Sequence, residues 1–106
     1  MNNSKLEIIC GVKISDISLI DNDAGIVFEN GCSPSIYNKF TLSGINKRDE
    51  KILIGRKITK INEDAQEITM TLEGNFMITI NMRDNAYSGP EALQLRIPGN
   101  PIVIWN

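Results

Sequence analysis

The chain has 106 residues, of which 42% are hydrophobic and 23% charged, and its formal net charge is −2. This composition is typical of a single globular domain with a modest core and excludes a disordered chain. No apolar run approaches the roughly 18 residues of a membrane span, and the first residues lack the apolar core of a signal peptide. We therefore expect a cytoplasmic protein without membrane contact.

Scarce residue types restrict the chemistry of the chain. It contains two cysteines, Cys10 and Cys32, and no histidine. Histidine is the most frequent general acid–base group and transition-metal ligand, and two cysteines alone cannot complete a structural zinc site. We expect no enzyme activity, no catalytic residue, no metal and no cofactor. Both cysteines fall on apolar strand patterns, which favours buried free thiols over a disulfide or a reactive thiol.

The chain repeats itself at an offset of 44 residues. Cys10–Ile17 aligns with Ile54–Ile61, and Ile26–Gly31 aligns with Met70–Asn75. A repeat of this kind identifies the unit of folding. We expect one domain, residues 1–106, built from two similar antiparallel meanders of three strands each.

The first unit, about residues 6–42, opens with the pattern Gly-x-x-Ile-x-x-Ile. Because a spacing of three breaks strict alternation, we expect a strand with a bulge between Ile14 and Ile17. The Asn-Gly pair at 30–31 suits a type I′ turn between the next two strands. Pro34 cannot donate a ladder hydrogen bond, so the third strand is expected to be an edge strand or a bulged one.

The second unit, about residues 52–97, repeats the opening pattern at Ile58 and Ile61. Apolar residues then alternate with polar ones, mostly threonine, through residues 68–82. This alternation predicts two strands with one solvated face. The Gly-Asn pair at 74–75 interrupts the alternation and suits a type II′ turn.

Two further segments complete the predicted fold. The polar connector at residues 43–51 could hold one or two helical turns, with Asn46 as N-cap. After the second unit, Ala92–Ile97 and Ile102–Trp105 are expected to form short strands around a turn at 98–101. The apolar end of the chain should dock on the core. We expect a mainly β protein, either a β-sandwich or a small open barrel.

Acidic residues occur in the loop between the first two strands of each unit, where they offer a negative surface to a cationic partner or serve solubility alone. The stretch from Lys47 to Lys60 holds six basic and two acidic residues. It has no interleaved aromatic residue, so we expect a solvated surface and no direct nucleic-acid contact. Tyr37 and Tyr87 are candidate interface anchors, although a tyrosine beside a turn more often covers the core edge. The candidate partner-binding residues are Asp21, Asp23, Glu63, Asp64, Glu67, Tyr87 and Glu91.

One resemblance adds to these patterns. The segment Ile54–Ile61 reads Ile-Gly-Arg-Lys-Ile-Thr-Lys-Ile, and two alternating strands joined by a glycine turn follow it. With the turn at Ser88–Ala92 and the ending Pro98–Trp105, the chain resembles an immunity protein of a bacterial contact-dependent growth-inhibition system, best from Gly55 to Trp105. The resemblance implies a monomer that binds and blocks a cognate toxin domain, often a nuclease, in a 1:1 complex inside the producing cell.

Three other functions stay open. A small ligand- or carbohydrate-binding β module is the main alternative, although 6% aromatic residues and one tryptophan argue against it. An enzyme that uses carboxylates is a further alternative. A self-associating structural domain would pair through an edge strand, either the strand that contains Pro34 or the C-terminal strand.

Overall fold

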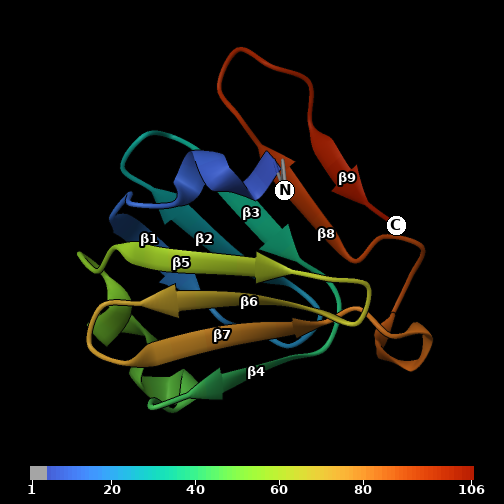
Figure 1. Cartoon of the computed structure of the whole chain (residues 1–106), viewed down its shortest axis with the longest axis horizontal. Coiled ribbons are helices and arrows are strands. Elements are labelled where there is room, and N and C mark those ends of the chain that lie inside the picture. Colours follow the sequence, from blue (N-terminus) through green and yellow to red (C-terminus); the bar gives the residue numbers. More distant parts are fainter. Residues whose placement is uncertain (1–4) are drawn as a thin grey trace.

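The protein is a sandwich of two antiparallel β-sheets (Figure 1). The computed structural model describes residues 5–106. One sheet has the order β1-β2-β3-β8-β9 and the other has the order β4-β7-β6-β5. The strands are β1 (Ile14–Ser18), β2 (Ala24–Phe28), β3 (Ser33–Ile36), β4 (Phe40–Ser43), β5 (Ile58–Glu63), β6 (Glu67–Leu72), β7 (Phe76–Asn81), β8 (Leu93–Arg96) and β9 (Val103–Trp105). The predicted mainly β fold is confirmed, as an open sandwich and not a closed barrel.

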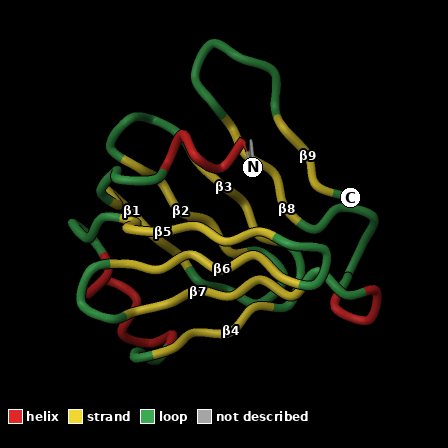
Figure 2. The backbone as a smooth tube through the Cα atoms, viewed as in Figure 1, coloured by secondary structure: helices red, strands yellow, loops and turns green. Residues whose placement is uncertain are grey.

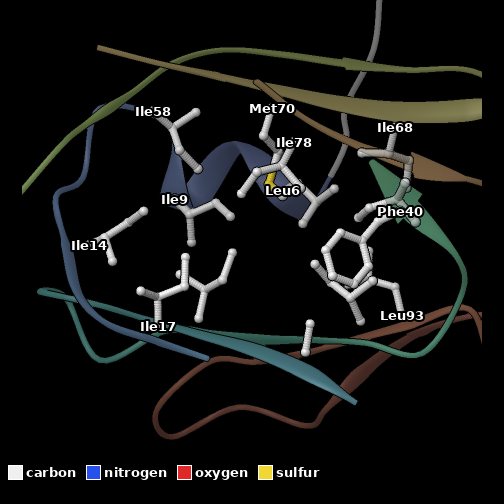
Figure 3. Packing of buried hydrophobic residues seen from close by; sticks show 14 of the residues in the cluster. Leu6, Ile9, Ile14, Ile17, Phe40, Ile58, Ile68, Met70, Ile78 and Leu93 are labelled. Atoms are coloured by element: carbon white, nitrogen blue, oxygen red, sulfur yellow. The ribbon is translucent and has the colours of Figure 1, made fainter. Parts of the chain in front are cut away.

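The core lies between the two sheets. Every second residue of β6 is buried, as expected for a strand with one face on the core. Figure 3 shows Met70 and Ile78 of the four-stranded sheet pointing toward Ile14 and Ile17 of the other sheet. The alternation read from the sequence is therefore the pattern that forms this interface between the sheets.

The 44-residue repeat is a structural pseudo-twofold. The Gly11 N–H donates to the Ile58 carbonyl at 2.7 Å, and the Gly55 N–H donates to the Ile14 carbonyl at 2.7 Å. Each bond becomes the other when the two repeats exchange places, so a rotation and not a translation relates the units. The pseudo-axis passes near the antiparallel bridge at Lys13, which pairs with its own repeat equivalent.

The predicted bulges occupy equivalent positions in the two repeats. The register of β1 against β2 shifts between Ile14 and Asp16, and the register of β5 against β6 shifts between Ile58 and Lys60. The spacing of three between isoleucines therefore marks a bulge in both units.

The two expected three-stranded meanders are present as β1-β2-β3 and β5-β6-β7, and each unit in addition exchanges a strand with the other. β4 leaves the first unit and pairs with β7, placing Phe40 beside Ile80. β8 leaves the second unit and pairs with β3, placing Leu93 beside Ile36. The C-terminal strand β9 extends the five-stranded sheet beyond β8, as an addition without a counterpart in the first unit.

In the described part of the chain, three 3₁₀ helices lie at the margins of the sheets (Figure 2): η1 (Lys5–Ile9), η2 (Lys47–Leu53) and η3 (Asp84–Ala86). η2 confirms the helical turns expected in the connector, although its N-cap residue Asn46 makes no side-chain cap hydrogen bond. η1 was not expected, and the repeat relates it to η2. The two helices bury the equivalent residues Ile9 and Leu53, which close the core beside β5 and β1.

Both hairpin turns differ from the predicted types. The loops at 29–31 and 73–75 each contain three residues between paired positions, whereas two-residue turns were expected. In the first loop only Gly31 has a positive φ, and in the second both Gly74 (φ 90°) and Asn75 (φ 65°) do. A type I′ turn needs two positive φ values and a type II′ turn needs one, so both predictions are wrong.

The strand that contains Pro34 is interior and not an edge. β3 lies between β2 and β8, and Pro34 is buried beside Leu95 of β8. The β2–β3 ladder pairs Ser35 and Ile36 but omits Pro34. A short ladder on that side accommodates the missing N–H donor.

Glycines with a positive φ provide a test of backbone strain. Gly44 has φ +86°, and a Cβ there would lie 2.9 Å from the backbone oxygen of Asn75. Gly55 has φ +88° with nothing within 4 Å of such a Cβ. We expect Gly55→Ala to lower the free energy of unfolding by about 1–2 kcal/mol, and Gly44→Ala to cost about 1 kcal/mol more because overpacking adds to the strain. Urea denaturation measures the free energy of unfolding of both variants. Equal losses would contradict a steric clash at Gly44.

Candidate partner-binding surface

Both acidic turns lie at the end of the sandwich where the chain crosses between sheets. β3 ends at Ile36, beside Ala24 at the start of β2, and β7 ends at Asn81, beside Glu67 at the start of β6. Residues 37–39 alone carry the chain from β3 to β4, which pairs with β7. The β1–β2 and β5–β6 turns are therefore near one another. We define the crossover end as residues 19–23, 37–39, 63–67 and 82–92.

Three hollows connect the acidic residues of this end. Glu63, Asp64 and Glu67 line a hollow of about 510 Å³ on the outer face of the four-stranded sheet. Glu67 also lines a second hollow, of about 330 Å³, together with residues 39–41. Asp21 lines a third, of about 390 Å³, with the same residues 39–41. The structure thus places one carboxylate from each repeat on either side of the short crossover.

Hydroxyl and amide groups form the surface between these carboxylates. The register of the four-stranded sheet aligns Thr41 of β4, Thr79 of β7, Thr69 of β6 and Asn62 of β5 in one row. All four side chains belong to the outer face and line the hollows. The surface is a polar platform with carboxylates at its margin, suited to hydrogen bonding and to cation attraction.

Asp64 is held in a defined orientation by its own turn. Its Oδ1 accepts the N–H groups of Gln66 at 2.8 Å and Glu67 at 2.9 Å. These backbone hydrogen bonds, with a smaller contribution from the positive charge of Arg83, lower the pKa of Asp64 below the ordinary 3.8. The carboxylate is therefore ionised and fixed at neutral pH.

The depressed pKa of Asp64 predicts a specific acid response. A carboxylate whose folded pKa lies below its unfolded pKa stabilises the fold above the unfolded value, and this stabilisation is lost as the pH falls through the folded value. In Asp64→Asn the amide oxygen still accepts the turn N–H groups but does not titrate. We expect its stability to decline less than that of the wild type between about pH 4 and pH 2. Urea denaturation at stepped pH measures this, and parallel profiles would contradict the assignment.

The first acidic turn is partly neutralised. Asp21 forms an ion pair with Lys47, whose ammonium also lies 4.7 Å from the centre of the Phe40 ring. Asp23 is exposed, and the repeat relates it to Glu67 of the second turn. Asp23 and Glu67 are therefore the equivalent pair of carboxylates that this end presents.

The C-terminal strand docks beside the second turn, as expected from its apolar sequence. Trp105 is half-buried, and its Nε1–H donates to Oε2 of Glu63 at 2.8 Å. The Trp105 carbonyl also accepts the N–H of Ala92 at 2.8 Å. These contacts connect the Glu63 turn to the connection between β7 and β8.

The two tyrosines have different environments. Tyr87 is half-buried and packs against the core. This agrees with the expectation that a tyrosine beside a turn covers the edge of the core. Tyr37 instead lines a separate hollow of about 270 Å³, with residues 88–90 and Glu91. The Glu91 carboxylate accepts a hydrogen bond from Gln94 at 2.8 Å. Tyr37 is therefore the tyrosine that lines this hollow, whereas Tyr87 packs on the core.

The crossover end and its adjoining hollows are acidic within a nearly neutral protein. Together with Lys47, the ion-pair partner of Asp21, they hold seven carboxylates and four cations, a net charge of −3, whereas the whole chain carries −2. The carboxylates are Asp21, Asp23, Glu63, Asp64, Glu67, Asp84 and Glu91, and the cations are Lys39, Lys47, Lys60 and Arg83. The sequence patterns did not predict the crossover, which brings the turns of both repeats together.

Three of the six basic residues between Lys47 and Lys60 make structural contacts. Lys47 pairs with Asp21, and Lys51 donates to the Ile17 carbonyl at 2.7 Å. Arg56 lies over the Phe76 ring, with 5.4 Å between the guanidinium carbon and the ring centre. These contacts fix η2 and the start of the second unit to the rest of the fold.

Neither cysteine is activated. Cys32 is buried and Cys10 is half-buried, and both are free thiols. Desolvation raises the pKa of each, which disfavours the reactive thiolate. Within residues 5–106, no group of three or more histidine, cysteine, aspartate or glutamate side chains is arranged to hold a metal ion.

The fold and this surface define a small antiparallel β-sandwich with an acidic end. No protein-family model, no curated protein and no solved structure matches the chain. Over the described part of the chain, no helix has the length and apolar character needed to cross a membrane.

Proposed function

We propose that this protein is an immunity-type inhibitor, which binds a cationic toxin domain, a nuclease of the ribonuclease kind, and blocks its active-site cleft. The observation that supports the proposal best is the convergence of two acidic turns on one end of a rigid sandwich. A nuclease must attract phosphate, so its cleft is cationic. An acidic surface of matching size can occupy such a cleft without performing any chemistry.

Electrostatics would give this complex a high association rate. Complementary charges steer two proteins together and raise the on-rate, more than they add to the final affinity. The fixed carboxylate of Asp64 and the exposed carboxylate of Asp23 suit this role, because they need no rearrangement to meet a cation.

The protein is large enough for tight inhibition. A standard interface buries about 800 Å² on each partner. The accessible surface of the chain is 5974 Å², so such an interface would use roughly an eighth of it. One crossover end per chain favours a monomer that binds its partner 1:1 in the cytoplasm of the producing cell.

Charge reversal at the equivalent pair tests this proposal. A pull-down with tagged protein, at low and moderate salt, should recover one cationic protein whose nuclease activity the wild type inhibits. We expect the double variant Asp23→Lys with Glu67→Lys to associate at least about tenfold more slowly, and with a weaker salt dependence.

A matched control separates local from overall charge. Glu7→Lys with Glu29→Lys makes the same change in net charge, in η1 and in the loop near it at the opposite end of the sandwich. This control should inhibit as the wild type does. Recovery of no partner at either salt, or equal slowing in both double variants, would refute the proposal.

A further inference from the structure

The pseudo-twofold reveals which part of the chain the fold does not need. The crossover from β3 to β4 takes three residues, 37–39, whereas the equivalent crossover from β7 to β8 takes eleven, 82–92. Both connections join the same pair of sheets at the same end. Since three residues suffice, the longer connection is an insertion, and insertions on a rigid scaffold commonly carry recognition.

This insertion is anchored at several points. The N–H of Lys39 donates to the Ala86 carbonyl at 3.1 Å, and the N–H of Tyr37 donates to the Ala92 carbonyl at 2.9 Å. Ser88 Oγ donates to the Tyr37 carbonyl at 3.0 Å. The longer connection is thus folded back on the shorter one. Such a preorganised loop loses little conformational entropy on binding.

The two connections border an open hollow of about 270 Å³ at Tyr37. Tyr37 contributes an aromatic residue, Pro90 an apolar ring and Glu91 a carboxylate. Gln94 Nε2 donates to Glu91 Oε1 at 2.8 Å and so fixes the direction of that carboxylate. The hollow therefore combines an apolar lining with one oriented negative charge.

We propose that this hollow is the anchor site for an arginine side chain of a partner protein. A guanidinium stacks on aromatic and proline surfaces and forms a planar fork that matches a carboxylate. The net charge of −3 around the crossover end favours a cation at this position. The assignment deepens the proposed function, on which it rests for the nature of the partner.

A small probe tests the anchor site without any partner. In an NMR titration, N-acetyl-arginine amide should cause saturable shifts at the backbone amides of Tyr37, Ser88 and Glu91. The lysine and norleucine analogues should bind at least about fivefold more weakly, because they lack the stacking fork or the charge. Glu91→Gln should weaken arginine binding at least about fivefold, because the oriented charge is lost. Glu7→Gln, far from the hollow, should not.

Each result decides the assignment. Absence of saturable shifts, an equal response to norleucine or lysine, or unchanged binding in Glu91→Gln would overturn it. Because the probe is a single amino acid, a positive titration together with an empty pull-down would refute the inhibitor function and keep the arginine site. If the titration is negative but the pull-down recovers a toxin, only the arginine site is refuted, because the toxin then binds through another surface.

Discussion

Replacing Ile14 by alanine and replacing Ile58 by alanine should lower the free energy of unfolding by similar amounts, about 2–5 kcal/mol each. Both side chains are buried, with 0% and 1% of their surface exposed. They occupy equivalent positions at the bulges of β1 and β5, and each lies next to the pseudo-axis. Deletion of the same atoms from equivalent packing should leave cavities of similar size.

Urea denaturation of the two single variants measures this equivalence. Ile102→Ala is a suitable control, because Ile102 is 44% exposed and outside the strands, and it should cost less than about 1 kcal/mol. If Ile14→Ala and Ile58→Ala differ by more than about 2 kcal/mol, their environments are not equivalent and the pseudo-twofold does not extend to the energetics.

The repeat made most of the fold predictable. Local signals, such as the isoleucine spacing of three and the alternation through residues 68–82, identified the bulges and the strands of the second unit. The strand β4 was missed because Phe40–Ser43 is only four residues long and follows a proline-containing strand. Its place beside β7 depends on long-range packing, which no local pattern encodes. The predictions of the turn types were wrong for a related reason, because the length of each loop depends on the register of its strands.

The candidate surface was predictable in composition but not in geometry. The acidic turns were visible in the sequence, as was their matched position in the two units. Their convergence follows from the three-residue crossover at 37–39, which appears only once β4 is placed in the second sheet. The same geometry distinguishes Tyr37, which lines a hollow, from Tyr87, which packs on the core.

The exchanged strands predict how a divided chain behaves. If the chain is split between Ile45 and Asn46, fragment 1–45 keeps β1 to β4, and fragment 46–106 keeps β5 to β9. Each fragment then holds a strand whose pairing partner belongs to the other fragment. Alone, each would also expose the inner face of its sheet to water and lose the apolar burial between the two sheets. We expect neither fragment to fold as a monomer.

Mixed in equal amounts, the two fragments should assemble into a 1:1 complex with the circular dichroism spectrum of the intact chain. The complex regains both exchanged pairings and the reciprocal bonds from Gly11 to Ile58 and from Gly55 to Ile14. Its melting temperature should rise with concentration, because folding is now coupled to association. A fragment that is monomeric by light scattering and also unfolds cooperatively would contradict the exchange of strands. A homodimer of either fragment would agree with it, because the pseudo-twofold permits two copies of one unit to exchange β4 or β8 in the same way.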